Sequence, residues 1–336
     1  MQSAFYGFAG ERLTADERDF FRDADPAGYI VFARNCTSRD QVSALTDELR
    51  SIHGRAGLPI LIDQEGGRVA RMKPPHWPKF PAAEAFARLY QVAPISAIEA
   101  ARANAAAIAA VLTEVGVNVD CLPVLDVRKP GATDIVGDRS FGESAMQVAA
   151  LGRATLEGLA SNGVVGVVKH MPGHGRALVD SHKTLPIVRS SDEELEEDLE
   201  PFAALSDAPM GMVAHLVFTA WDEERPASLS RTVIDKIIRG RLGFDGFLMT
   251  DDIGMHALTG GFDERTRLSL DAGNDAVLHC SGKMEEMIAV ASEAGTMPDD
   301  AVGRLERAMG SVSAGATAPA AYEELAAKRD ELLALA

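Results

Sequence analysis

Two short segments of the chain combine carboxylate, imidazole, guanidinium and ammonium groups around glycines. Residues 63–71 read Asp-Gln-Glu-Gly-Gly-Arg-Val-Ala-Arg. Residues 169–182 hold three histidines, one lysine and one aspartate. Further along, Thr250 is followed by two adjacent carboxylates, Asp251 and Asp252. These groups include a candidate nucleophile, candidate proton donors and acceptors, and charged side chains that can bind the hydroxyls of a polyhydroxylated ligand.

A metal site is the first alternative for the histidine-rich segment. His170 and His174 are four residues apart, and Asp180 and His182 are separated by one residue, which resembles the spacing of metal ligands. This segment is a loop with glycine and proline, whereas two imidazoles converge on one metal at positions i and i+4 of a helix. The three cysteines are far apart and form no Cys-x-x-Cys pair, which disfavours a thiolate zinc site. We therefore expect no metal site in this segment.

Eight short apolar runs alternate with helical patterns along the chain. Each run is nearly continuously apolar, which is typical of parallel strands buried on both faces. Eightfold alternation of strand and helix predicts a single-domain (β/α)8 TIM barrel of the α/β class. An open doubly wound sheet is the alternative, but no Gly-x-Gly-x-x-Gly motif follows the first run and the chain has no P-loop. The predicted strands are residues 5–7, 29–32, 60–62, 117–122, 164–168, 211–216, 246–249 and 276–279.

Carboxylate, ammonium and imidazole side chains follow these runs directly. In a (β/α)8 barrel, the side chains that perform chemistry stand at the C-terminal ends of the strands. We therefore expect one shared site at this end of the barrel. The polar residues at the predicted strand ends are Asp63, Asp120, Asp126, Lys169, His170, His215, Asp251, Asp252 and His279.

Three sequences of the form Ser-x-x-Glu/Gln predict helix starts. Ser38, Ser96 and Ser190 are each followed three residues later by Glu or Gln, which is the pattern of a capping box. Residues 321–335 are predicted to form a terminal helix that packs on the barrel. We therefore expect residues 1–336 to form one catalytic domain.

Several polar residues have a simpler, structural explanation. Residues 193–200 form an acidic run, which is typical of a solvent-exposed helix face. His174 is expected to brace its loop, and Arg68 is expected to form a structural ion pair. Isolated histidines are more often hydrogen-bonded structural residues than catalytic ones. The histidines interpreted in this way are His53, His76, His215, His256 and His279.

The composition excludes several classes of protein. Of the 336 residues, 33 are Lys or Arg and 50 are Asp or Glu, which gives a net charge of −17. This balance argues against nucleic acid and anionic membranes as partners, because both need clustered basic residues. The most apolar stretch, residues 100–117, is interrupted by polar residues and is expected to be a core helix. The N-terminus lacks the pattern of a signal peptide and cysteines are sparse, so we expect a cytoplasmic protein.

The motifs, in their order along the chain, resemble those of glycoside hydrolase family 3, and within it the single-domain bacterial β-N-acetylglucosaminidases of the NagZ type. The resemblance spans nearly the whole chain. Met171 stands where the family usually has Phe, which affects packing beneath Lys169 and His170 and leaves the expected activity unchanged. The motifs that carry the resemblance are Asp-Gln-Glu-Gly-Gly-Arg-Val at 63–69, Gly-Asp-Arg-Ser-Phe-Gly at 137–142, Lys-His-x-Pro-Gly-His-Gly at 169–175, Asp-Ser-His at 180–182 and Thr-Asp-Asp at 250–252.

The resemblance implies a role for each matching residue. Asp251 would be the catalytic nucleophile that forms a covalent glycosyl-enzyme, with Asp252 as the adjacent competitor. His182, backed by Asp180, would be the acid/base on a mobile loop. A histidine has an ordinary pKa of about 6.5, which suits both proton donation and proton acceptance. The residues implied to bind the terminal sugar are Asp63, Arg71, Arg139, Lys169 and His170.

The implied activity is that of a retaining exo-β-N-acetylglucosaminidase in cell-wall recycling, and the resemblance implies no metal or organic cofactor. The implied partner is a small carbohydrate from peptidoglycan, N-acetylglucosaminyl-β-1,4-(1,6-anhydro)-N-acetylmuramic acid, with or without its peptide. A family 3 β-glucosidase and a β-N-acetylglucosaminide phosphorylase stay open as alternatives, as does a sugar-binding protein without turnover. Spacing alone assigns no residue to the 2-acetamido group.

Overall fold

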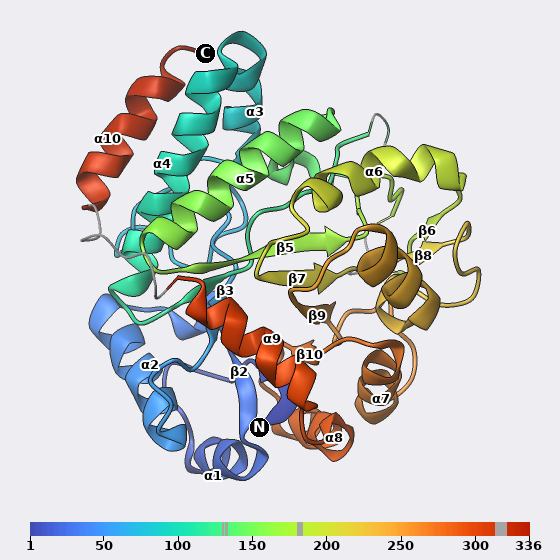
Figure 1. The fold of residues 1–336 in the computed structure, drawn as a ribbon. Coiled ribbons are helices and arrows are strands. Elements are labelled where there is room, and N and C mark those ends of the chain that lie inside the picture. The colour runs from blue at the N-terminus through green and yellow to red at the C-terminus, as the bar shows by residue number, and fades with distance from the viewer. Residues whose placement is uncertain (130, 132–133, 180–183, 313–320) are drawn as a thin grey trace.

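Eight parallel strands close on themselves into a barrel (Figure 1). The computed structural model describes residues 1–129, 131, 134–179, 184–312 and 321–336. Around the barrel the strands follow the order β1-β10-β9-β7-β5-β4-β3-β2, and each neighbouring pair is parallel. All eight predicted runs overlap a barrel strand, so the predicted (β/α)8 fold is confirmed. The strands are β1 (Gln2–Tyr6), β2 (Pro26–Val31), β3 (Ile60–Ile62), β4 (Val119–Asp120), β5 (Val165–Met171), β7 (Met210–Val213), β9 (Phe247–Asp252) and β10 (Ala276–His279).

Helices surround the barrel and cover its outer face (Figure 1). Residues Val233–Arg241 form a π-helical segment, and Gly137–Arg139 form a short 3₁₀ turn. The α-helices are α1 (Ala15–Ala24), α2 (Arg39–His53), α3 (Ala83–Val92), α4 (Pro94–Thr113), α5 (Ala145–Ser161), α6 (Asp192–Ala204), α7 (Phe262–Ala272), α8 (Met284–Ala294), α9 (Asp299–Gly310) and α10 (Tyr322–Leu333).

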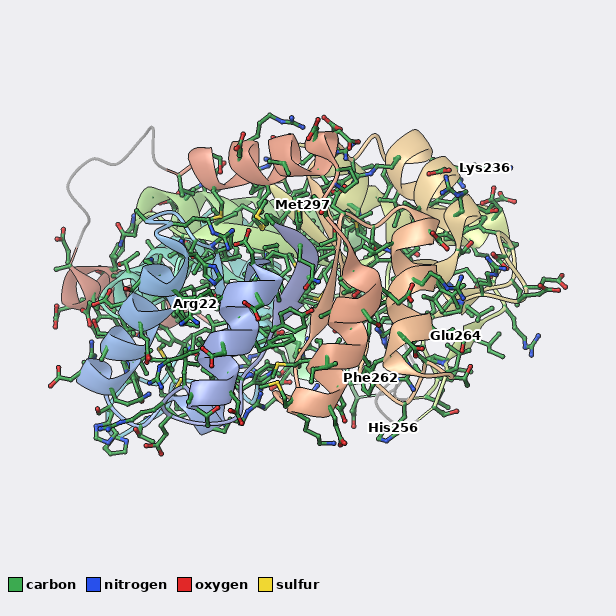
Figure 2. All side chains as sticks on the ribbon, turned by 90° about the horizontal axis from the view of Figure 1, so that it is seen from below. Arg22, Lys236, His256, Phe262, Glu264 and Met297 are labelled. Carbon is green, nitrogen blue, oxygen red and sulfur yellow. The ribbon has the colours of Figure 1, made fainter. Side chains whose placement is uncertain are left out.

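The interior of the barrel is filled by apolar side chains from all eight strands, including Phe5, Leu61 and Phe247. Side chains of α9, among them Leu305, join the same cluster and close the N-terminal end of the barrel. Figure 2 shows Met297 beside α9 at this end, with His256, from the loop after β9, toward the other end. Side chains thus close the N-terminal end of the barrel, and the C-terminal end of the barrel is available for a functional site.

Helix starts agree with the capping patterns in part. The Ser38 hydroxyl accepts from the amide of Gln41 at the start of α2, as predicted. The box predicted at Ser190 lies one residue later, where Ser191 and Glu194 cap α6 reciprocally. The start predicted at Ser96 is wrong, because α4 begins at Pro94. Proline suits the first helical position, since its missing N–H would have no partner there.

The acidic run on α6 is not wholly exposed, which corrects one expectation. Asp198 is buried, and its carboxylate accepts from Nε of Arg176 at 2.5 Å. Arg176 also donates to the carbonyl of Glu194 at 2.7 Å, so the loop after β5 is anchored on α6. A short parallel pair outside the barrel, β6 (Ile187–Val188) with β8 (Val217–Phe218), was not predicted from the sequence.

Helix α4 is the one described helix that is long and apolar enough to cross a membrane by length and composition alone. Most of the apolar stretch of α4 is buried inside the protein, where α4 packs between α5 and α10, as expected for a core helix. On the α10 side, Lys328 pairs with Glu99 at 3.1 Å. The buried Arg329 donates to the side-chain oxygen of Asn104 at 3.2 Å, and its guanidinium lies over the Phe80 ring.

Gly158 of α5 packs directly against the backbone of α4, and this contact generates a prediction. A Cβ at Gly158 would lie 2.3 Å from the carbonyl oxygen of Arg102, whereas a Cβ at Gly303 of α9 would make only an ordinary contact, at 3.7 Å from Nη1 of Arg307. We expect Gly158→Ala to lower the free energy of unfolding by about 2 kcal/mol, because overpacking against backbone outweighs the gain in helix propensity. Urea denaturation measures the effect. Gly303→Ala is the matched control and should raise stability by up to about 1 kcal/mol, so equal shifts in both variants would contradict the prediction.

Candidate active site

The C-terminal ends of the strands enclose a cavity of about 260 Å³. All five residues implied to bind the sugar line this cavity, together with both candidate nucleophiles. Glu65, which was not predicted as a site residue, lies among them. The charged and imidazole side chains of the lining are Asp63, Glu65, Arg71, Arg139, Lys169, His170, Asp251 and Asp252.

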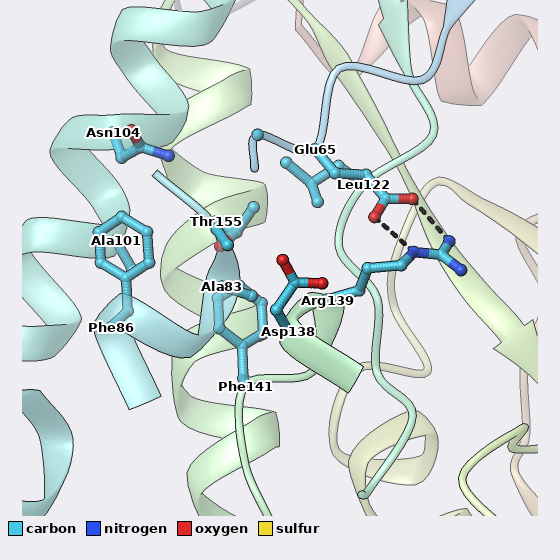
Figure 3. A pocket seen from close by; sticks show the side chains of 12 residues that line it. Glu65, Ala83, Phe86, Ala101, Asn104, Leu122, Asp138, Arg139, Phe141 and Thr155 are labelled. Atoms are coloured by element: carbon cyan, nitrogen blue, oxygen red, sulfur yellow. Dashed lines mark hydrogen bonds and ion pairs between the residues drawn. The ribbon is translucent and has the colours of Figure 1, made fainter. Parts of the chain in front are cut away.

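Lys169 is the centre of the charged network. It lies near the C-terminal end of β5 with its side chain 2% exposed, and its Nζ lies 2.9 Å from Asp63 Oδ1 and 2.7 Å from Glu65 Oε1. Glu65 also accepts two hydrogen bonds from Arg139, at 2.8 and 2.7 Å, in the bidentate geometry that Figure 3 shows. Bidentate pairing fixes the plane of the guanidinium as well as its distance. The two cations therefore share one carboxylate and hold each other in position.

A tight glycine turn presents these carboxylates. Asp63 directly follows β3, and the amides of Glu65 and Gly66 both donate to the carbonyl of Val69. Gly66 has a φ of 95°, and a Cβ there would lie 2.2 Å from the carbonyl oxygen of Pro81. Only glycine adopts this conformation without strain. The Glu-Gly-Gly sequence is thus needed for the turn that aims Glu65 into the cavity.

Mutual pairing keeps this network charged despite its burial. Burial opposes ionisation of Glu65, but Arg139 and Lys169 outweigh it and lower the pKa of Glu65 to about 2. The same balance, with Lys169 and Arg71, holds the pKa of Asp63 well below its ordinary value. For Lys169, the attraction of Asp63 and Glu65 exceeds the cost of burial and raises its pKa. These carboxylates are therefore anionic, and Lys169 cationic, at neutral pH.

Arg71 occupies the other side of Asp63. Its Nη2 donates to Asp63 Oδ2 at 2.8 Å, so the two oxygens of Asp63 serve different cations. The guanidinium groups of Arg34 and Arg71 both lie over the ring of Phe32, which also lines the cavity, at 4.8 and 4.9 Å from the ring centroid. Contacts of this kind are attractive and restrict the orientation of the guanidinium.

Asp126 orients the ring of His170, although Asp126 does not itself line the cavity. His170 Nδ1 lies 2.7 Å from Asp126 Oδ2, and the amide of His174 donates to Asp126 Oδ1 at 2.7 Å. Burial opposes ionisation of Asp126, but the neighbouring His170 and these hydrogen bonds outweigh this effect and lower the pKa of Asp126 to about 2. An ionised carboxylate only accepts, so Nδ1 is the donor, and Nε2 of His170 faces Arg139 at 3.5 Å.

The two adjacent aspartates at the end of β9 have different environments. Burial raises the pKa of Asp251, but the neighbouring His170 and His215 and the amide of Asp252 outweigh it and leave the pKa below its ordinary value. Asp252 accepts from the amides of Gly254 and Cys280, yet burial and the charge of Asp251 raise its pKa to about 6. Asp251 is therefore the more readily ionised carboxylate of the pair.

Not every strand-end residue reaches the cavity, which corrects the expectation of one shared lining. Asp120, Asp126, His215 and His279 are fully buried and lie outside the lining of the cavity. Burial raises the pKa of Asp120 to about 8, and this carboxyl accepts from the amide of Gln64 at 3.0 Å. His279 contacts Glu286 at 3.2 Å, in line with the structural role expected for it.

Two predicted catalytic residues, Asp180 and His182, lie outside the described residues. Of the other predictions in this region, His174 is buried, and burial lowers its pKa to about 4, which fits a neutral bracing residue. Arg68 forms an ion pair with Asp138 at 2.9 Å, as predicted. Within the described part of the chain, no group of three or more His, Cys, Asp or Glu side chains could hold a metal ion.

Glu65 offers a test of how strongly the network stabilises the fold. We expect Glu65→Ala to lower the free energy of unfolding by about 3–5 kcal/mol, because Lys169 and Arg139 stay buried with less counter-charge. Chemical denaturation at pH 7 measures this loss. Glu99→Ala removes an exposed carboxylate that also pairs with two cations, Arg102 and Lys328, and should cost about 0–1 kcal/mol. Similar losses in both variants would contradict the buried network.

The lowered pKa of Glu65 also predicts a dependence of stability on pH. The ordinary pKa of about 4.5 applies to the unfolded chain and about 2 to the folded protein, so Glu65 stabilises the fold above pH 4.5 and loses this contribution as the pH falls toward 2. Over this interval the unfolding free energy of the wild type should fall more steeply than that of Glu65→Gln, by up to about 1.4 kcal/mol per pH unit. Denaturant titrations between pH 5 and pH 2 compare the slopes, and parallel slopes would contradict the prediction.

Comparison with known proteins agrees with this geometry. Residues 5–308 match the sequence model of the glycosyl hydrolase family 3 N-terminal domain. A β-hexosaminidase of Xanthomonas campestris pv. campestris is 38% identical over 292 residues, which cover 85% of this chain and 87% of that protein. NagZ of Neisseria gonorrhoeae, solved in complex with N-trifluoroacetyl-D-glucosamine, is similar with a TM-score of 0.86 and 31% identity, over 99% of this chain and 98% of NagZ.

A second solved structure extends the similarity. The glycoside hydrolase family 3 β-N-acetylglucosaminidase of Paenibacillus sp. str. FPU-7 has a TM-score of 0.86 and 31% identity over 98% of this chain, which spans 66% of that longer protein. Similarity at this level across nearly the whole barrel, with the charged cavity at the end where such barrels perform chemistry, makes this chain a member of glycoside hydrolase family 3.

Proposed function

We propose that this glycoside hydrolase is a retaining exo-β-N-acetylglucosaminidase that acts on peptidoglycan fragments. The observation that carries the proposal is the half-buried Asp251, which is held ionised at a cavity lined by carboxylates and cations. The names of its relatives, β-hexosaminidase and β-N-acetylglucosaminidase, support the choice of sugar. The ligand in the Neisseria NagZ complex, N-trifluoroacetyl-D-glucosamine, supports it as well.

The terminal sugar would bind through its hydroxyl groups to the cavity lining. Carboxylate oxygens of Asp63 accept from hydroxyls, whereas Lys169, Arg71 and Arg139 donate to sugar oxygens. Nε2 of His170 would meet a hydroxyl of the sugar, because Nδ1 of the ring is held by Asp126. These partners are already fixed by one another, so binding orders few side chains, which favours affinity.

The reaction would proceed by double displacement. In the first step a carboxylate oxygen of Asp251 attacks the anomeric carbon, the glycosidic bond breaks, and His182 donates its proton to the departing oxygen. In the second step His182 takes a proton from water, the water oxygen attacks the anomeric carbon, and Asp251 is released. Asp180 would orient His182 and stabilise its cationic form. Two inversions at the same carbon retain its configuration.

The natural substrate that we propose is N-acetylglucosaminyl-β-1,4-(1,6-anhydro)-N-acetylmuramic acid, with or without its peptide. Removal of its terminal sugar would be a step of cell-wall recycling. That role would place the enzyme in the cytoplasm, which fractionation of the host cell would test. The β-glucosidase and phosphorylase alternatives differ from this proposal in products: free glucose in one case, and N-acetylglucosamine 1-phosphate after addition of inorganic phosphate in the other.

Asp251 is the first residue to test. We expect Asp251→Ala to lower kcat on p-nitrophenyl N-acetyl-β-glucosaminide by at least about 10⁴-fold, because the covalent intermediate cannot form. Release of p-nitrophenol measures kcat, with the plain β-glucoside as the comparison for sugar preference. Asp252→Asn keeps an acceptor oxygen and should stay within about tenfold of the wild type. A larger loss for Asp252→Asn than for Asp251→Ala would reverse the assignment of the nucleophile.

The acid/base role of His182 predicts a dependence on the leaving group. We expect His182→Ala to lower kcat/KM about 10²–10⁴-fold on an alkyl glycoside, whose leaving group needs a proton, and less than about tenfold on the p-nitrophenyl glycoside. Steady-state kinetics on both substrates measures this difference. His76→Ala, which removes an exposed histidine, should leave both values unchanged. Equal losses of His182→Ala on both substrates would speak against His182 as the acid.

A further inference from the structure

The direction of the Asp251 carboxylate is coupled to the residue that follows it. Asp251 Oδ1 accepts a hydrogen bond from the amide of Asp252 at 2.8 Å. Any rotation of the backbone at Asp252 therefore changes where the Asp251 oxygens point. The groups that hold Asp252 in place thus control the position of the proposed nucleophile.

Asp252 is held by groups from three parts of the barrel. Its side-chain Oδ1 accepts from the amide of Gly254 at 2.9 Å and from the amide of Cys280, after β10, at 3.2 Å. Its backbone carbonyl lies 3.0 Å from Nε2 of His215, which follows β7. The contact with His215 comes from a side chain that the proposed mechanism does not use.

His215 is itself fixed in one orientation. Its Nδ1 lies 2.7 Å from the hydroxyl of Ser228, and both residues are fully buried. A carbonyl oxygen only accepts, so Nε2 of His215 carries the proton and Nδ1 of the neutral ring accepts from the Ser228 hydroxyl. The amide of Ser228 donates to the carbonyl of Ala214 at 3.2 Å, so Ser228 is tied to the same strand end as His215.

We propose that His215, with its tautomer set by Ser228, is a positioning residue for the nucleophile. It holds the backbone of Asp252 so that Asp251 stays directed at the anomeric carbon. This role rests on the proposed function, in which Asp251 attacks that carbon. His215 does not line the cavity and makes no contact with substrate in this scheme. A small displacement of a reacting group, of about 1 Å, is enough to lower a rate about 10²-fold.

The test compares His215→Leu, which removes the donor, with His215→Gln, whose side-chain amide can reach the Asp252 carbonyl. We expect His215→Leu to lower kcat on p-nitrophenyl N-acetyl-β-glucosaminide about 30- to 100-fold with KM changed less than about threefold. His215→Gln should recover most of this loss. Covalent labelling of Asp251 by a fluorinated N-acetylglucosaminyl fluoride, followed by intact mass, should slow in the same proportion, because it reports attack by Asp251 directly.

His279→Leu is the matched control. His279 is also a fully buried histidine at a strand end, but the hydrogen bonds of its ring are to Glu286 and Ser281, which follow β10 and do not belong to β9. We expect His279→Leu to lower the thermal midpoint as much as His215→Leu while leaving kcat at 25 °C within about twofold of the wild type. Equal kcat losses in both leucine variants, or no loss in His215→Leu at a temperature where it is folded, would overturn the positioning role.

Asp251→Ala, assayed in parallel, separates the two proposals. If Asp251→Ala is inactive and His215→Leu is as active as the wild type, the positioning role alone is wrong. If Asp251→Ala keeps its turnover, the proposed nucleophile is wrong and the role of His215 is wrong with it. Loss of turnover in both variants, with recovery in His215→Gln, supports the role of His215.

Discussion

The ammonium group of Lys169 is buried at the end of β5, and much of the site depends on this one constraint. Removing a charge from water costs several kcal/mol unless partners replace the lost hydration. Asp63 and Glu65 supply that replacement, and both come from the segment after β3. Glu65 in turn fixes Arg139, which belongs to the turn between β4 and α5. These buried charges are therefore compensated only when β5, the segment after β3 and the turn between β4 and α5 are all packed in their final positions.

The same network explains how the cavity stays polar without collapsing. Each cation is held by a carboxylate, and each carboxylate by at least one cation, so no side chain must rearrange to keep its charge. A sugar entering such a site meets donors and acceptors whose directions are already set. Preorganisation of this kind reduces the entropy lost on binding. It also concentrates positive charge near Asp251, which favours the ionised form of that carboxylate.

Asp251 and Asp252 illustrate how position decides chemistry for two identical residues. Asp251 lies near His170, His215 and Lys169, and its pKa is lowered despite burial. Asp252 accepts from two backbone amides, but it also feels the charge of Asp251 and burial, and its pKa rises to about 6. Sequence alone did not separate them without the family resemblance. The separation comes from neighbours on β5, β7 and β10 that are distant along the chain.

The sequence by itself determined the eight strands, the end of the barrel that carries the site, and most of the charged and imidazole side chains around the cavity. These features depend on local apolar runs and on residue types placed directly after them, and both are readable without a structure. Tertiary structure alone decided that Glu65 unites two cations, that Asp126 and His215 act from outside the cavity, and that Asp198 is buried under Arg176. Each of these depends on which segments meet in space. Burial and pairing across such contacts set the charge and the orientation of these side chains. They produce no periodic pattern in the sequence, so the sequence alone does not predict them.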